Sequence, residues 1–249
     1  LGVDGGGDER VVMVVDIGTN TEVLVATPDR LVAASCPAGP AFEGGLVTWA
    51  MQGAEGAIET VRMRDDGGFE LDVIGSVRPR GICGSGLIDL LAELRRTGTM
   101  SPLGVFAGKA REVVVDPASG ITLSRADASN LAQAKAANTA GQWIVLRTLG
   151  LKPADVDRLY LAGGFASHVD LENAIAIGFL PPVPAERIVK AGNAAIRGAR
   201  RLLLDRAARD RLEQVVRRVE HVELETTPDF FDIFVEGCQF KPIPDLLVA

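Results

Sequence analysis

Acidic, glycine and short polar residues meet in the segment Asp16-Ile17-Gly18-Thr19-Asn20-Thr21-Glu22, between two apolar runs. A phosphate group is bound by several backbone N–H groups that point into one concavity, and glycine lets the chain come close to it. Gly18 can supply that approach, and the next three residues, Thr19, Asn20 and Thr21, offer amides and short side chains. Asp16 can hold Mg²⁺ through water or orient an attacking water. The alternative is an ordinary hairpin turn, which the same residue types favour.

A second glycine segment lies at Leu161-Ala162-Gly163-Gly164-Phe165-Ala166. An apolar strand that ends in two glycines, before a helix, lets a flat ligand approach the backbone. No lysine follows at the spacing of a Walker motif, so that kind of phosphate loop is not indicated. A tight strand-to-helix turn would give the same pattern.

A third glycine segment, Gly81-Ile82-Cys83-Gly84-Ser85-Gly86, runs directly into an amphipathic helix. A glycine-rich helix start is a natural anion site, so Gly84, Ser85 and Gly86 are candidates for binding a cofactor. A close crossing of two helices that only glycine permits explains the segment equally well.

The elements that must position these segments follow from the apolar periodicity. We expect a strand meander over 11–15, 22–27 and 31–34, followed by a hairpin of 58–63 with 70–74. The remainder reads as helices alternating with single strands. Helices are predicted near 85–98, 126–149, 171–177, 194–204 and 206–219, and strands at 158–162 and 188–189. The fold class is therefore α/β, a mixed sheet with βββαβα order covered by helices.

Composition narrows the class of protein. The 249 residues are 47% hydrophobic and 24% charged, which suits one large domain or two small ones, and the net charge of −7 argues against a nucleic-acid partner. No apolar run approaches a membrane span and no signal peptide opens the chain, so we expect a cytoplasmic protein with no membrane contact. Three widely spaced cysteines predict free thiols rather than a disulfide framework or a metal site.

Five ordered segments resemble one known family. These segments are DIGTNTE (16–22), CPAGPAFEGG (36–45), RGICGSGLID (80–89), LAGGFASHVDLENAIAIGFLP (161–181) and GNAAIRGA (192–199). They are similar to the C-terminal domain of reductive activators of corrinoid-dependent methyltransferases. That domain is a ribonuclease-H-like, actin-like ATPase lobe of the superfamily of acetate and sugar kinases, heat-shock chaperones and actin.

The resemblance implies an ATP-using machine that returns inactive Co(II) corrinoid proteins to Co(I) by electron transfer. Its cofactors would be ATP, Mg²⁺ and a [2Fe-2S] cluster in an N-terminal domain, and its partner the corrinoid protein of a methyltransferase system. Asp16 would be the catalytic carboxylate that holds Mg²⁺ through water. Glu22 would assist the attacking water, or cap the hairpin. Gly163, Gly164 and Phe165 would face adenosine. Ser35, Cys36 and Glu43, in or beside the 36–45 loop, would face the corrinoid partner; a rigid proline-glycine turn over the core is the alternative.

Part of that machine is missing from the sequence. Three scattered cysteines cannot supply the four thiolates of a plant-type cluster. Only one DxGT loop is present, whereas a complete actin-like ATPase uses two. We therefore expect residues 1–249 to form a single C-terminal domain, the second lobe, cut from a longer chain.

Two other functions remain open at this stage: a small-molecule kinase of the same superfamily, of acetate or sugar type, and a non-catalytic partner-binding domain. The sequence also leaves open whether the chain forms a homodimer.

Overall fold

A six-stranded mixed sheet forms the centre of the computed structural model, which describes residues 10–37 and 40–242. The strands lie in the order β10-β9-β1-β2-β3-β11. Strands β1, β2 and β3 form an antiparallel meander. Strand β9 pairs parallel to β1, β10 pairs parallel to β9, and β11 pairs parallel to β3. Their bounds are β1 Val12–Ile17, β2 Thr21–Ala26, β3 Leu31–Cys36, β9 Arg158–Ala162, β10 Ile188–Gly192 and β11 Val219–His221.

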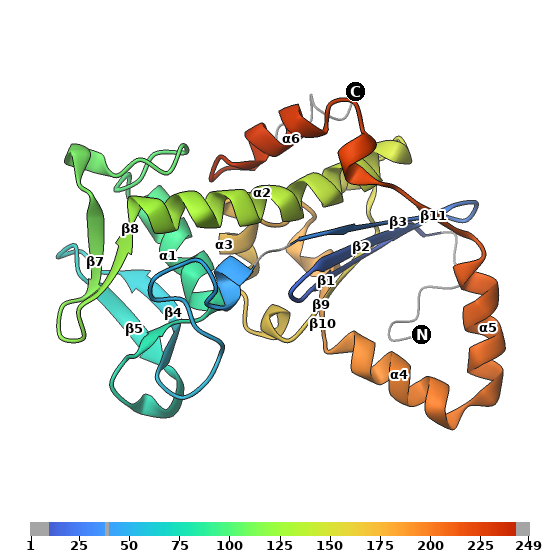
Figure 1. Ribbon diagram of the computed structural model, residues 1–249, viewed down its shortest axis with the longest axis horizontal. Coiled ribbons are helices and arrows are strands. Elements are labelled where there is room, and N and C mark those ends of the chain that lie inside the picture. The colour runs from blue at the N-terminus through green and yellow to red at the C-terminus, as the bar shows by residue number, and fades with distance from the viewer. Residues whose placement is uncertain (1–9, 38–39, 243–249) are drawn as a thin grey trace.

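One face of the sheet is covered by the long helix α2 (Arg125–Thr148), with α6 (Phe230–Gly237) on its outer side (Figure 1). A capping box starts α2, in which Ser124 accepts from the Asp127 amide and Asp127 accepts from the Ser124 amide. Alternate side chains of β2, such as Val23 and Val25, are fully buried on the side that α2 covers. A Cβ built on Gly141 of α2 would lie 2.9 Å from Cys36 Sγ, so the helix sits directly on β3.

Polar side chains of α2 hold the segment after α3 (Leu171–Ala176). Lys135 Nζ donates to the carbonyl of Ile177 at 3.0 Å, and Asn138 Nδ2 donates to that of Phe179 at 2.8 Å. These groups are buried, and their bonds satisfy carbonyls at the end of a helix that would otherwise lack partners. The segment is thereby fixed against α2.

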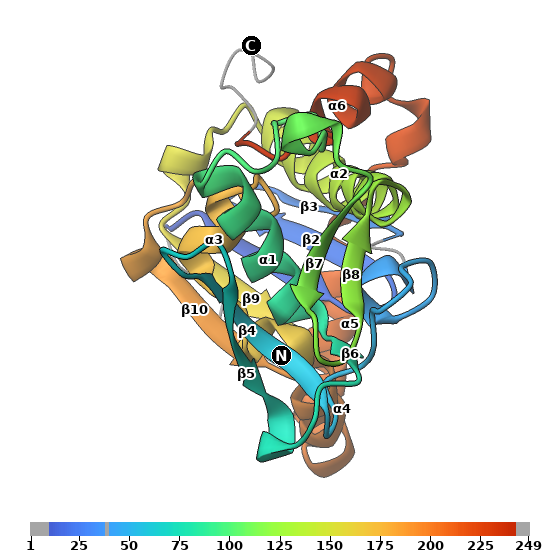
Figure 2. The ribbon, with the colours of Figure 1, turned by 90° about the vertical axis from the view of Figure 1, so that its left-hand side faces the viewer.

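The residues that lie between β3 and α2 in the sequence form a second layer, called the inserted layer, beside the central sheet (Figure 2). It consists of β4 (Ala57–Met63), β5 (Phe69–Val73), β6 (Gly81–Ile82), α1 (Gly84–Arg96), β7 (Glu112–Asp116) and β8 (Ile121–Ser124). Asp89 and Glu93 of α1 accept hydrogen bonds from the amides of Val61 and Met63. The helix thus satisfies backbone donors of β4 beyond its short pairing with β6.

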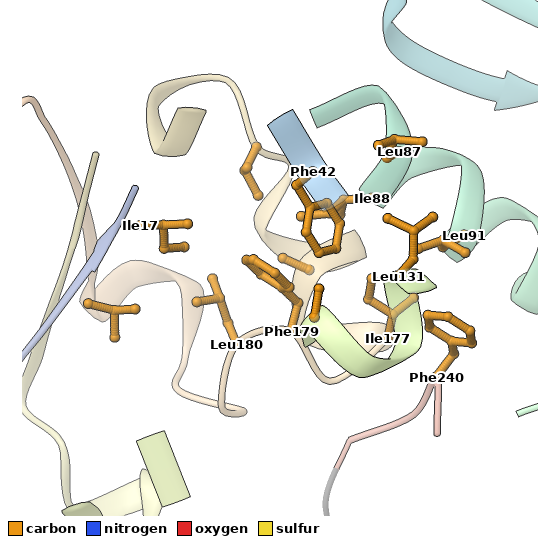
Figure 3. Packing of buried hydrophobic residues seen from close by; sticks show 14 of the residues in the cluster. Ile17, Phe42, Leu87, Ile88, Leu91, Leu131, Ile177, Phe179, Leu180 and Phe240 are labelled. Atoms are coloured by element: carbon orange, nitrogen blue, oxygen red, sulfur yellow. The ribbon is translucent and has the colours of Figure 1, made fainter. Parts of the chain in front are cut away.

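The hydrophobic core continues from the sheet into the inserted layer (Figure 3). Phe42 and Phe179 meet edge to face between the two parts, with ring centroids 5.3 Å apart. Ile88 and Leu91 of α1 and Leu131 of α2 are fully buried in the same cluster. The two layers are therefore joined by apolar packing beneath any cleft between them.

The remaining helices, α4 (Ala194–Leu204) and α5 (Arg206–Val216), form a hairpin that projects from the body (Figure 1). Asn193 caps α4 by accepting from the Ile196 amide, and Asp205 caps α5 by accepting from the Ala208 amide. Within residues 10–37 and 40–242, no helix has the length and apolar character needed to cross a membrane.

The predicted α/β class and βββαβα order are confirmed, with the inserted layer placed after the third strand. The hairpin of 58–63 with 70–74 forms as β4 and β5, within one residue at each end. The sequence reading missed β6, the β7–β8 hairpin, β11 and α6. These are short or lie outside the stretches in which periodicity is clear.

Candidate functional site

The end of β1 and the end of β9 lie side by side, which brings the first two glycine segments together. Asp16 is in register with Ala162 across the parallel pair. Gly163 follows with φ +104°, and a Cβ built on it would lie 2.0 Å from the carbonyl oxygen of Ile17. Only glycine permits that approach. The two glycine segments, far apart in the sequence, are thus in direct contact in the fold.

A row of polar residues crosses the same edge of the sheet. Asp16 pairs with Glu22 across β1 and β2, and Glu22 pairs with Ser35 across β2 and β3. Directly opposed residues of antiparallel strands share one face of the sheet. The hydroxyl of Ser35 donates to Glu22 Oε1 at 3.4 Å. The predicted catalytic pair is therefore adjacent, and Ser35 lies beside it.

Burial raises the pKa of Asp16, which is half-buried at the end of β1. Gly18, Thr19 and Asn20, between the strands, are exposed, and the amide of Gly18 donates to the carbonyl of Asn20 at 2.9 Å. Thr21 differs from these three. Its side chain is fully buried, and its hydroxyl has no hydrogen-bond partner among the described residues. The exposed three can meet a ligand directly, whereas the Thr21 hydroxyl cannot.

A cavity of about 350 Å³ opens beside Gly164. A Cβ built on Gly164 would meet no atom within 4 Å, so the backbone there faces open space. Across the cavity lie Gly84 and Ser85, at the start of α1. Pockets of this size hold small ligands such as a nucleoside. The second and third glycine segments thus line one cavity.

The start of α1, at Cys83, Gly84 and Ser85, lines this cavity. The N-cap residue is Cys83, which makes no side-chain capping bond, and no acidic residue lies in the first turn. First-turn amides without a capping side chain attract electron-rich groups. Gly86 has another role: its Cβ would lie 2.3 Å from the carbonyl oxygen of Ile58, so it lets α1 approach β4 and does not line the cavity.

Several lining residues were not identified from the sequence. His168, on the turn after the double glycine, places Nδ1 4.0 Å from Glu59 Oε2 of β4, and both residues line the cavity. The other missed residues come from the loop before β4, from the turn after β5 and from the helix cap; they are Phe42, Met51, Gln52, Gly53, Ile74 and Cys83. Phe42 and Cys83 lie in segments quoted above but were not singled out, and no motif signals the other four, because they converge only through the packing of the inserted layer.

The residues predicted to face a partner have different environments in the structure. Ser35 is exposed, but Cys36 is 2% exposed beneath α2, and burial followed by the charge of Glu22 raises its thiol pKa to about 12. That thiol does not lie on a surface a partner could reach. The side chains of Glu43 and Phe165 lie outside the part of the chain that the structure describes.

The donor set fits a nucleotide with a water-linked Mg²⁺. Mg²⁺ is usually held by one or two carboxylates together with water and phosphate oxygens. Asp16 supplies one carboxylate next to an exposed turn, and no group of three or more His, Cys, Asp or Glu side chains among the described residues forms a metal cage. When bound, Mg²⁺ would neutralise phosphate charge.

A mixed sheet ending in a glycine turn, a double glycine against it and a cavity between two layers define an actin-like ATPase lobe. Residues 10–245 match the family model described as the C-terminal domain of RACo, the ASKHA domain, and the chain belongs to this family of actin-like ATPase domains, which implies that it binds nucleotide.

Relatives and a solved structure agree with this membership. The corrinoid activation enzyme RamQ of Eubacterium limosum is 30% identical over 257 aligned positions, which cover 94% of this chain and 43% of RamQ. The [Co(II) methylated amine-specific corrinoid protein] reductase of Methanosarcina barkeri is 25% identical, over 90% of this chain and 45% of the reductase. The solved structure of a reductive activator for corrinoid, iron-sulfur protein superposes with a TM-score of 0.84 at 34% identity, over 97% of this chain and 41% of the activator. The chain thus spans less than half the length of each.

Proposed function

We propose that this chain is the nucleotide-binding domain of a reductive activator that returns inactive Co(II) corrinoid proteins to Co(I) by ATP-coupled electron transfer. The single observation that carries the proposal is the junction of Asp16, Gly163 and Gly164 beside a cavity lined by Gly84 and Ser85. Two of the relatives named above act on corrinoid proteins by name, and the solved structure is that of an activator.

In this proposal each segment has a distinct role. Gly164 and the start of α1 hold the nucleoside in the cavity, with the phosphates directed toward the exposed turn Gly18, Thr19 and Asn20. Asp16 holds Mg²⁺ through water, and Glu22, next to it, orients the attacking water. The open space beside Gly164 and the exposure of the turn support this arrangement.

The electron would come from a [2Fe-2S] domain elsewhere in the same polypeptide. The reduced cluster would supply one electron to Co(II), giving Co(I), and the free energy of ATP binding and partner binding would drive this uphill step. We propose that residues 1–249 are the second lobe of the ATPase, and that its corrinoid partner belongs to a methyltransferase system. The free state of Cys36, Cys83 and Cys238 supports a reducing, cytoplasmic location.

Isothermal titration of Mg-ATP and Mg-ADP into the chain tests the nucleotide part. We expect weak binding, because a second lobe contributes only part of an ATP site, and we expect Asp16→Ala to abolish it. In a full-length activator carrying this domain, Asp16→Ala should also abolish the ATP-dependent change of the corrinoid absorption spectrum from Co(II) to Co(I). Unchanged reduction by that variant would contradict the proposal.

Two other outcomes would select the remaining alternatives. Phosphate transfer from ATP to a small-molecule acceptor would indicate a kinase of the same superfamily. Binding of the corrinoid partner by a full-length protein that ignores ATP would indicate a non-catalytic interaction domain.

A further inference from the structure

A short segment after α6 crosses from one layer of the fold to the other. Residues 239–241, here called the strap, contact α1, α2 and the turn that follows α3. The side chain of Phe240 is fully buried and belongs to the same core cluster as Leu131 and Ile177 (Figure 3). Because interiors are closely packed, a segment buried at a junction fixes the relative position of the parts that it contacts.

On one side the strap is bound to the inserted layer. The amide of Phe240 donates to the carbonyl of Pro102 at 2.8 Å, and Arg95 of α1 donates through Nε to the Phe240 carbonyl at 2.9 Å. Arg95 also donates through Nη1 to the carbonyl of Met100 at 2.7 Å, so one guanidinium holds both the strap and the loop after α1. Both backbone groups of Phe240 are thus bonded to the inserted layer, and leaving either unpaired in the core would be costly.

On the other side the strap is bound to the sheet and its helices. Lys135 of α2 donates to the carbonyls of Gln239 and Ile177, at 2.7 Å and 3.0 Å, so one buried amine joins the strap to the end of α3. Gly178, the next residue, has φ +73°, and a Cβ built on it would collide with the carbonyl oxygen of Lys241. Glycine is therefore required at 178 for the strap to lie this close.

The same two layers form the walls of the candidate nucleotide cavity. Gly164 belongs to the sheet side of the cavity, and Ser85 belongs to the inserted layer. Phe42 of the inserted layer lines the cavity and meets Phe179 edge to face, and Phe179 follows Gly178 directly in the chain. A continuous line of contacts thus runs from the cavity wall to the strap. A ligand that bridges two walls binds most tightly when the walls are already held at the right separation.

We propose that the strap couples the two layers to nucleotide binding: when seated, it holds them at the separation that the nucleotide requires, and Lys135 and Arg95 are the positioning residues that keep it seated. Because linkage is reciprocal, bound nucleotide in turn stabilises the seated strap. The strap is already seated in the ligand-free fold, so nucleotide slows its opening without changing its average position. The proposal rests on the proposed function for its ligand and adds regulation by a segment of which no residue lines the cavity.

Gly178→Ala tests the strap without altering the cavity. The added Cβ should unseat the strap, because the Lys241 carbonyl leaves no room for it. Gly150→Ala is the matched control: Gly150 also follows a helix, with φ +67°, but a Cβ built on it would meet no atom within 4 Å. The control therefore carries the same backbone strain without touching the strap. In titrations with Mg-ADP, we expect Gly178→Ala to weaken binding about fivefold or more and Gly150→Ala to stay within about twofold of the wild type.

Hydrogen exchange at the Phe240 amide gives the reciprocal readout. Saturating Mg-ADP should slow this exchange by the factor by which unseating the strap weakens binding, because both measure one coupling free energy. A segment that only filled the core would exchange at a rate independent of nucleotide. Unchanged Mg-ADP affinity in a folded Gly178→Ala protein would overturn the proposal, and so would Phe240 exchange that does not respond to Mg-ADP.

A second pair of variants keeps the test decisive if circular dichroism shows that Gly178→Ala does not fold. Arg95→Met removes the bond to the Phe240 carbonyl, so it should speed exchange at the Phe240 amide and weaken Mg-ADP binding. Arg78→Met is its control, because Arg78 donates to the Ala118 carbonyl within the inserted layer and does not touch the strap. Equal Mg-ADP affinity in these two variants would contradict the role of the strap.

A wild-type chain that binds no Mg-ADP would contradict the proposed function and leave the strap to a ligand-free measurement. Amide chemical shifts of Gly164 and Ser85, on the two walls of the cavity, report the separation of the layers without any nucleotide. They should move in Gly178→Ala and stay in place in Gly150→Ala. Shifts that are the same in both variants would show that the strap does not set the cavity.

Discussion

Asp16 illustrates a residue whose placement costs stability. Burial raises its pKa, which means that the folded state disfavours the ionised carboxylate relative to the unfolded chain. The stabilising contribution of a group with a raised pKa is present below the unfolded pKa and is lost as pH rises through the folded value. At neutral pH an ionised Asp16 thus opposes folding, as expected for a group retained for binding.

We therefore expect Asp16→Asn to unfold at the same temperature as the wild type or slightly higher at pH 7, while Mg-nucleotide binding is lost. Differential scanning calorimetry at pH 3 and pH 7 would measure the first effect. The gain should be larger at pH 7, because at pH 3 the wild-type carboxyl is protonated in both states. A variant that is less stable than wild type at pH 7 but binds nucleotide normally would show that Asp16 is structural.

Lys135 is a second residue with an unusual environment. It is fully buried, and burial lowers its pKa to about 7, although the nearby Cys238 and Glu236 favour its charged form. Between pH 7 and 9 the unfolded chain keeps this proton while the folded chain releases it, so stability should rise with pH. The rise should reach up to about 1 kcal/mol per pH unit.

Urea unfolding at pH 7, 8 and 9 would check this expectation. Lys135→Met should remove the rise, and Lys152→Met, at an exposed lysine, should retain it. Burial raises the pKa of the Cys36 and Cys238 thiols, so near pH 9 they oppose the rise, and the comparison of wild type with Lys135→Met isolates the lysine. An equal pH slope in wild type and Lys135→Met would contradict the assignment.

At the scale of elements, the two adjacent glycines of the β9 turn have separable roles. Gly163 has φ +104° and lies against the Ile17 carbonyl, whereas Gly164 faces open space. We expect Gly163→Ala to destabilise the protein by about 2–3 kcal/mol, through strain and a forced shift of β1. Gly164→Ala should leave stability within about 0.5 kcal/mol and weaken nucleotide binding.

Chemical unfolding and nucleotide titration of the pair would measure both effects. If the cleft binds nucleotide beside Gly164, Gly163→Ala must destabilise the protein more than Gly164→Ala does. Equal destabilisation by the two variants would mean that Gly164 is also a packing residue, and that the cavity beside it is not a binding surface.

The N-terminus of α2 is held by Asp127, which accepts from Ser124 and from both the amide and the hydroxyl of Thr48. Partial burial opposes ionisation, but these hydrogen bonds prevail and lower the pKa of Asp127. Its stabilising contribution is present above the unfolded pKa and is lost as pH falls through the folded value. Asp127→Ala should cost about 2–3 kcal/mol at pH 7 and less at pH 3, as measured by thermal unfolding. A loss that does not shrink in acid would contradict this role.

Sequence alone predicted the α/β class, the βββαβα order along the chain and the glycine segments as candidate ligand sites, because apolar strand runs and glycine turns are local signals. It did not predict the far side of the cavity. His168, Glu59 and Gln52 meet there only because Phe42, Phe179 and α1 pack the inserted layer against the sheet. It likewise could not show that Thr21 and Cys36 point beneath α2, since one residue of strand register decides which face a side chain takes.

At the scale of the whole molecule, the basic α4–α5 hairpin and the candidate nucleotide site occupy different parts of the fold. The cleft lies between the sheet and the inserted layer, whereas the basic α4–α5 hairpin projects at one end (Figure 1). The two are joined at the end of β10, just before α4, where the carbonyl of Gly192 accepts from the Gly163 amide at 3.0 Å. A ligand at Gly163 and Gly164 thus lies one hydrogen bond away from the strand that leads into the α4–α5 hairpin.

The central claim is that nucleotide occupies the cleft between the β1–β2 turn, the double glycine and the start of α1. Amide NMR with stepwise addition of Mg-ADP tests it most directly, because chemical shifts report weak binding and locate it. The account predicts concentration-dependent shifts at Gly18, Thr19, Gly164 and Ser85, with none around the distant groove at Leu103 and Val235. Absent shifts at high nucleotide concentration, or shifts that gather outside the cleft, would contradict it.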